Sequence, residues 1–143
     1  MMLKQVSIFA QNKAGSTYAI METLANANIN VRAMTIADTA EFGIIRLIVS
    51  DAVKALEALR NNNFTANVTD VIGFTVPDES GKLCDVLRLL GEQSVSFEYS
   101  YSLMGKKQGE ADIAMRVKDK DLDKAMAILA ESGVKLLTQE DVI

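Results

Sequence analysis

The second half of this chain repeats the pattern of its first half, and this repeat constrains the fold more than any other feature. Gly15 and Gly81 are both loop glycines that precede a helical pattern, and they lie 66 positions apart. Further along, Leu59 and Leu129 occupy matching helical positions 70 apart. A spacing that grows across a loop is what a duplicated domain with one loop insertion produces. The sequence therefore predicts two similar domains.

Each half reads as strand, helix, strand, strand, helix, strand from the period of its apolar residues. In the first half, strands are expected at 3–10, 31–38, 42–49 and 64–71, with helices at 16–27 and from about 51 to 60. In the second half, strands are expected at 71–76, 95–104, 111–118 and 134–138, with helices at 82–92 and 121–132. The predicted domains are residues 1–70 and 71–143, without a linker between them.

This element order predicts an α+β fold. A strand–helix–strand unit closes by a right-handed crossover. Two interleaved units give an antiparallel four-stranded sheet with both helices on one face, the ferredoxin-like sandwich. In the second helix of the first half, helical spacing places Val53, Leu56 and Leu59 on the inner side. A domain of about 70 residues has a marginal core by surface-to-volume scaling, so pairing two of them increases burial.

The composition excludes several kinds of site. The chain contains no histidine and one cysteine, so neither a Cys/His zinc cluster nor a Ser-His-Asp or Cys-His nucleophile pair is available. The formal net charge of −4 disfavours general binding to nucleic acids and anionic membranes, which need a basic surface. We therefore expect no catalytic residues, no bound metal and no cofactor.

Cysteine usage and hydropathy bear on the compartment. Cys84 has no second cysteine with which to form an intramolecular disulfide, which fits a reducing environment. Nowhere does the sequence approach the run of about 20 apolar residues that a membrane-spanning helix needs. These observations predict a cytoplasmic protein.

The two loops before the first helix of each half carry a resemblance to a known family. They read NKAGS at 12–16 and DESGK at 78–82, each a short polar loop with a glycine. The stretch LANANINVRAMTIAD at 24–38 adds a helix end, a strand entry and an acidic residue. Together with the element order and the duplication, these features resemble ACT domains, regulatory modules that bind amino acids in many biosynthetic enzymes.

The resemblance implies a ligand site between modules, because ACT domains pair side by side and bind effectors at their interface. In the first half it places candidate residues in the loop, at the start of the helix, and at both ends of the second strand. They are Asn12, Lys13, Ala14, Gly15, Ser16, Thr17, Asn30, Val31, Arg32, Ile36, Ala37 and Asp38. In the second half the candidates are Asp78, Ser80 and Gly81.

The second half departs from this pattern at its second strand. Phe97 and Glu98 stand near the strand opening, and Leu103 with Met104 stands where the first half has Asp38. We therefore expect the second half to serve mainly as a wall of the site.

The chemistry of the first loop suits an amino acid. The N–H groups at a helix N-terminus favour a carboxylate, and Gly15 lets the backbone approach closely. Amide oxygens such as those of Asn12 and Asn30, or the carboxylate of Asp38, suit an ammonium group.

The leading hypothesis is a non-catalytic, allosteric amino-acid sensor that forms a homodimer and signals to an enzyme or regulator not contained in this sequence. The main alternative is a structural dimerisation or regulatory subunit of a biosynthetic enzyme without a ligand of its own. RNA binding is a third possibility, because RNA-recognition modules share the element order, but the strands lack their basic and aromatic run. A small enzyme is a fourth, although its candidate acids form no obvious pair.

Overall fold

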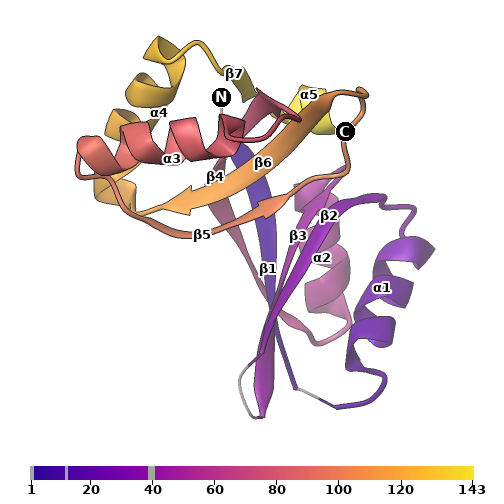
Figure 1. Ribbon diagram of the computed structural model, residues 1–143. Coiled ribbons are helices and arrows are strands. Elements are labelled where there is room, and N and C mark those ends of the chain that lie inside the picture. Colours follow the sequence, from indigo (N-terminus) through magenta and orange to yellow (C-terminus); the bar gives the residue numbers. More distant parts are fainter. Residues whose placement is uncertain (1, 12, 39–40) are drawn as a thin grey trace. The chain divides into compact units, whose positions relative to one another are not determined.

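The computed structural model describes residues 2–11, 13–38 and 41–143. The chain divides into two compact units (Figure 1). We call Lys4–Thr69 the first module, and Asp70–Val142, together with residues 2 and 3, the second module.

The first module is a four-stranded sheet with two helices. Its elements are β1 (Leu3–Gln11), α1 (Ser16–Asn26), β2 (Val31–Asp38), β3 (Phe42–Val49), α2 (Ala52–Asn61) and the start of β4 (Thr65–Pro77). The strand order is β2-β3-β1-β4, and β1 and β2 both run antiparallel to β3. Helices α1 and α2 pack against each other (Figure 1). This is the predicted ferredoxin-like sandwich.

The core of this module consists of apolar side chains from the strand faces that point toward the helices. Val6 and Ile8 of β1 point to the helical face and are fully buried against Ile20 and Leu24 of α1. The second helix contributes Ala55 and Leu59. The prediction that Val53 lies inward is wrong, since 78% of it is exposed. Successive helical residues turn by about 100°, so Val53 lies about 200° from Ala55, on the opposite side of α2.

The second module repeats this arrangement. Its elements are the end of β4, α3 (Lys82–Glu92), β5 (Phe97–Ser102), β6 (Glu110–Val117), a 3₁₀ turn (Asp119–Asp121), α4 (Leu122–Glu131), β7 (Lys135–Leu137) and α5 (Gln139–Val142). The strand order is β5-β6-β4-β7, and all three pairings are antiparallel. The core gathers Phe74 of β4, Leu90 of α3, Met115 of β6 and Leu129 of α4. The protein is therefore an α+β chain of two tandem βαββαβ units.

Three features differ from the sequence expectation. The strands expected at 64–71 and 71–76 are one strand, β4, of 13 residues. The short helix α5 follows β7, where the sequence predicts no helix. Leu3 packs in the second module: a Cβ added at Gly73 would lie 2.5 Å from Leu3 Cδ1 and 3.1 Å from Leu137 Cβ. The glycine therefore permits this close approach of β1, β4 and β7.

The duplication extends to the backbone dihedral angles. A positive φ occurs at matching positions of the two modules, before the first helix, after it, and after the second helix. The matched pairs are Gly15 (86°) with Gly81 (87°), Asn28 (58°) with Ser94 (60°), and Asn63 (67°) with Gly133 (86°). These spacings of 66 and 70 are those of the sequence repeat, so the repeat reflects a shared backbone geometry.

Candidate functional site

The loop before α1 is fixed by a short series of backbone hydrogen bonds. The Lys13 N–H donates to the Gln11 carbonyl at 3.0 Å, and the Ser16 N–H donates to the Lys13 carbonyl at 3.2 Å. The Ala19 N–H then donates to the Gly15 carbonyl at 3.0 Å and begins the helix. These bonds tie the end of β1 directly to the first turn of α1.

The loop before α3 has the same scheme, shifted by 66 residues. Glu79 donates to the Pro77 carbonyl at 2.8 Å, and Lys82 donates to the Glu79 carbonyl at 3.2 Å. Asp85 donates to the Gly81 carbonyl at 3.0 Å. The two loops therefore present the start of their helices in the same way.

Both helices begin with a glycine in the N-cap position. Gly15 and Gly81 adopt left-handed geometry, and glycine has no side chain that could accept from the N–H groups of the first turn. By contrast, the Asp51 side chain caps α2 and accepts from the Lys54 N–H at 3.0 Å. The Ser16 and Lys82 N–H groups donate to loop carbonyls, but no N-cap side chain accepts from the other first-turn N–H groups of α1 and α3, where the helix dipole favours a carboxylate.

A cavity of about 470 Å³ lies beside the first loop. The end of β1, the loop, the first turns of α1 and the turn between α2 and β4 surround it. Its lining residues are Phe9, Ala10, Gln11, Lys13, Ala14, Gly15, Ser16, Ala19, Asn63, Phe64 and Thr65. Four of the predicted residues, at 13–16, therefore line one cavity.

A cavity of about 520 Å³ occupies the equivalent place in the second module. Its lining residues are Thr75, Val76, Pro77, Lys82, Asp85, Val86, Leu89, Gly109, Glu110, Ser132, Gly133, Val134 and Lys135. The predicted residues Asp78, Ser80 and Gly81 are exposed in the loop before α3 and are not among these lining residues.

The predicted residues of β2 fall into two separate groups. Asp38 and Ala10 both lie opposite Gly43 of β3, so the end of β2 is level with the end of β1 that leads into the loop. Val31 lies opposite Val49, at the far end of β3. A strand of eight residues covers about 23 Å, so the group at 30–32 and the loop lie at opposite ends of the sheet.

Within the group at 30–32, a pair of hydrogen bonds holds the backbone of Asn30. Its N–H donates to Ser50 Oγ at 3.0 Å, and its carbonyl accepts from the Ser50 N–H at 2.9 Å. Arg32 is half-buried, while Thr17 lies in the first turn of α1 and is half-buried as well. Asn12 and the side chain of Asp38 lie outside the described residues and atoms. The first module therefore brings 13–16 together and keeps 30–32 apart from them.

One titratable group near the second cavity has a shifted pKa. The Thr138 N–H donates to Asp141 Oδ2 at 2.8 Å, and the Thr138 hydroxyl donates to the same oxygen at 3.0 Å. These bonds, the backbone bond first, hold the pKa of Asp141 below its ordinary value of 3.8, and the Lys135 charge acts in the same direction. The interaction orders the residues that follow β7.

None of the second-half candidates named from the sequence lines the second cavity. Its lining includes Asp85 on α3, Glu110 on β6 and the turn Ser132–Lys135 between α4 and β7. The repeat held the signal that could have found some of them, because Asp85 and Lys135 occupy the positions of Ala19 and Thr65 in the first cavity.

Metal binding and membrane crossing can also be assessed for the described residues. Across those residues, no three His, Cys, Asp or Glu side chains gather closely enough to hold a metal ion. Within the same part of the chain, none of the helices has the length and apolar character that crossing a membrane requires.

Comparison with solved structures finds a strong match to a protein from Bacteroides thetaiotaomicron. It is 42% identical, with 99% of this chain and 96% of that chain covered and a TM-score of 0.91. The ligand-free regulatory subunit of aspartate kinase from Thermus thermophilus is 12% identical, with 90% and 91% covered and a TM-score of 0.66. A structure of aspartokinase alpha and beta subunits is 16% identical, with 92% and 96% covered and a TM-score of 0.59.

The aspartate kinase regulatory subunit and the aspartokinase are 12% and 16% identical to this chain, so these two structures show a shared fold and nothing beyond it. A comparison with curated proteins returned no match. The ACT domain pair family matches residues 1–143. The match agrees with the two βαββαβ units and their equivalent loops. The chain therefore belongs to the family of ACT domain pairs.

Proposed function

We propose that this protein is a non-catalytic regulatory protein that binds a free amino acid at the strand–helix loop of its first module. One observation carries the proposal: an uncapped helix N-terminus, preceded by a left-handed glycine, opens beside a cavity lined by residues 13–16. Membership of the ACT domain pair family supports a ligand-binding regulatory role.

The geometry supports a particular orientation of the ligand. The first-turn N–H groups of α1 and the Lys13 side chain would receive the carboxylate. The end of β2, at Ala37 and Asp38, lies at the same end of the sheet and would face the ammonium group.

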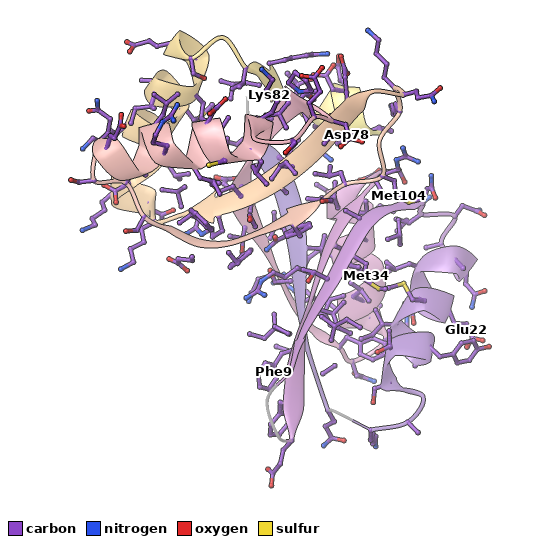
Figure 2. The ribbon with its side chains drawn as sticks, in the orientation of Figure 1. Phe9, Glu22, Met34, Asp78, Lys82 and Met104 are labelled. Carbon is purple, nitrogen blue, oxygen red and sulfur yellow. The ribbon has the colours of Figure 1, made fainter. Side chains whose placement is uncertain are left out.

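A second copy of the chain is the partner that we propose for completing the site. Residues 30–32 lie at the far end of β2 from their own loop, so they reach a ligand only at the loop of another module. Strand β2 is the outermost strand of its module, and its Met34 and Ile36 are 49% and 45% exposed. Met34 is labelled in Figure 2. An exposed apolar edge strand favours pairing with another strand, which supports a homodimer through β2.

Regulation follows if the ligand binds the paired form more tightly than the free form. Ligand binding then raises the fraction of the protein that is dimeric, and an enzyme or regulator in the cytoplasm responds to the dimer. The aspartate kinase regulatory subunit shares this fold and supports a regulatory role of this kind.

The test is a thermal-shift screen of the full chain against the twenty amino acids. A ligand at a hundredfold excess over its Kd stabilises the folded state by about 2.7 kcal/mol. At least one amino acid should raise the midpoint, and it should do so in the variant Ala14→Gln. In Ala14→Glu the introduced carboxylate repels the ligand carboxylate, so the increase should be lost.

Two results would argue against the proposal. If no amino acid raises the thermal-unfolding midpoint although the protein is a dimer, the protein serves in dimerisation without a ligand. If the two Ala14 variants respond equally, the ligand does not occupy the first cavity.

A further inference from the structure

We propose that the helix-free face of the sheet in the first module pairs with the same face of a second copy of the chain. This interface is separate from the edge pairing of β2 in the proposed function, and it does not require a ligand. The inference rests on two exposed aromatic rings and one guanidinium group on that face, and on the polar side chains that replace the rings in the second module.

The register of three strands defines this face. Ile8 pairs with Ile45, and both are buried toward α1 and α2. Because successive strand residues point to opposite sides, the neighbouring pair of Phe9 and Ile44 points away from the helices. Within the paired segments 5–11, 33–37 and 42–48, this side consists of the odd-numbered residues of β1 and β2 and the even-numbered residues of β3. We call it the open face.

Two aromatic rings lie exposed at one end of the open face. The ring centroids of Phe9 and Phe42 are 5.0 Å apart, and the rings are stacked with an interplanar angle of 22°. Phe9 is 51% exposed and Phe42 is 37% exposed; Phe9 is labelled in Figure 2. Ala37 beside them is exposed, and Ile44 is half-buried. Contiguous exposed apolar side chains of this kind mark a protein interaction surface.

The second module shows that the fold does not require these apolar residues. When the two modules are aligned on their strand pairings, Thr75 occupies the position of Phe9, and Asp112 occupies the position of Ile44. The Thr75 hydroxyl donates to Asp112 Oδ1 at 2.7 Å. A polar pair therefore satisfies the same place in the same sheet, so the exposed rings of the first module serve a purpose other than folding.

The open face also carries a chemical complement to its own rings. Arg46 lies between Ser7 and Thr35, two residues along β3 from Ile44. A guanidinium group is attracted to the face of an aromatic ring. In a two-fold symmetric interface each copy supplies both members of every contact. An axis that lies between two stacked open faces, midway between Arg46 and the rings, places the guanidinium of each copy over the rings of the other.

The charges on the open face favour a second copy as the partner. The chain has a formal net charge of −4, so most contacts between two copies bring acidic groups together. Among the described residues that pair on the open face, none carries a carboxylate, and Arg46 carries a positive charge. Two copies therefore meet at this face without repulsion between carboxylates, while each guanidinium gains an aromatic partner.

Sedimentation-velocity ultracentrifugation of the full chain over a dilution series tests this proposal. The wild type should associate and should dissociate on dilution. Phe42→Ser removes one ring and Arg46→Gln removes the guanidinium group. Each should raise the dissociation constant at least about tenfold, as expected for residues at the centre of an interface. Far-UV circular dichroism checks that the variants are folded, and if Phe42→Ser does not fold, Arg46→Gln decides the question.

The matched controls lie on α2, on the opposite side of the sheet. Val53→Ser removes an apolar side chain that is 78% exposed, and Lys54→Gln removes an exposed cation. Both should have the dissociation constant of the wild type within about twofold, as expected for surface substitutions outside an interface. A further variant, Met34→Ser on the outermost strand β2, reports separately on the edge pairing.

The outcomes distinguish the face pairing from the edge pairing. Weaker association of the folded open-face variants, with both controls unchanged, supports the proposal. The proposal is refuted if the wild type is monomeric or if either folded variant, Phe42→Ser or Arg46→Gln, associates like the wild type. If Met34→Ser alone weakens association, the edge pairing stands and the face pairing fails. If only the open-face variants weaken it, the face is the dimer interface and the edge pairing fails.

Discussion

The two modules share a backbone fold and differ in the side chains that line their cavities. Their first loops have the same hydrogen-bond scheme and nearly the same glycine φ, 86° and 87°. Their cavities, however, replace Phe9 and Phe64 of the first module with Thr75 and Val134 of the second. Duplication has thus kept the turn geometry while the lining has diverged. In this protein, the turn geometry and the lining of the cavities therefore depend on different sets of residues.

Substitutions in the two cores should have the largest effects on stability, and they test whether the two modules are packed alike. Phe74 and its first-module counterpart Ile8, 66 positions earlier, are both fully buried. We expect Phe74→Ala to cost about 3–5 kcal/mol and Ile8→Ala about 2–5 kcal/mol, because each leaves a cavity in a packed core. Urea denaturation followed by circular dichroism measures both. A cost below about 1 kcal/mol for either variant would contradict the packing described for that module.

An added Cβ at Gly73 would approach its neighbours more closely than one at Gly15, Gly81, Gly91, Gly105, Gly109 or Gly133, so this substitution should be the next most costly. An added Cβ would lie 2.5 Å from Leu3 Cδ1, and Leu3 is fully buried. We expect Gly73→Ala to cost about 1–3 kcal/mol through overpacking. Gly91→Ala is the control, since its Cβ would meet nothing within 4 Å. Gly91 lies in the last turn of α3, where the change should be neutral or stabilise by up to about 0.5–1 kcal/mol, and a loss of stability there would count against this reasoning.

The two N-cap glycines allow the closest comparison of backbone strain between the modules. An added Cβ meets nothing within 4 Å at Gly15 or Gly81, so the left-handed backbone alone sets the cost. We expect Gly15→Ala and Gly81→Ala to destabilise by about 1–2 kcal/mol each, and by the same amount within error. Thermal denaturation of the two variants measures this. Unequal costs would show that the loops differ in strain despite their matching hydrogen bonds.

The smallest effect concerns Asp141, which belongs to the second module alone. Its pKa is lowered in the folded state, so its contribution to stability is present above its unfolded value of 3.8 and is lost as the pH falls through the folded pKa. The stability difference between wild type and Asp141→Asn should therefore shrink on acidification. A carboxyl ¹³C titration should give a midpoint below 3.8, and a midpoint at or above that value would exclude the Thr138 bonds in solution.

Much of the fold could be predicted from the sequence because it depends on local periodicity. The strands at 31–38 and 42–49 have the expected bounds, since their apolar residues and flanking turns are unambiguous. The continuous strand β4 could not be distinguished from two strands, because an apolar run such as 71–76 gives no signal of where one domain passes into the next. Helix α5 is a single turn stabilised by Thr138 and Asp141, and four residues are too few to show a helical period.

The candidate site could be predicted only where it is contiguous in sequence. The loop at 13–16 is expected from its polar residues and glycine, and it lines a cavity. The charged lining of the second cavity combines residues from α3, β6 and the turn before β7. Bringing Asp85, Glu110 and Lys135 together requires the tertiary fold, which periodicity alone does not supply.

The central proposal is that the first module of this ACT domain pair receives its ligand beside its N-cap glycine. A ¹⁵N–¹H correlation titration of the full chain with each amino acid that binds tests it directly, because the amide signals of Gly15 and Gly81 report on the two loops separately. We predict that the Gly15 signal moves on titration and that it stops responding in Ala14→Glu. Ligand-dependent shifts elsewhere in the chain that leave the Gly15 signal unmoved would contradict the proposal.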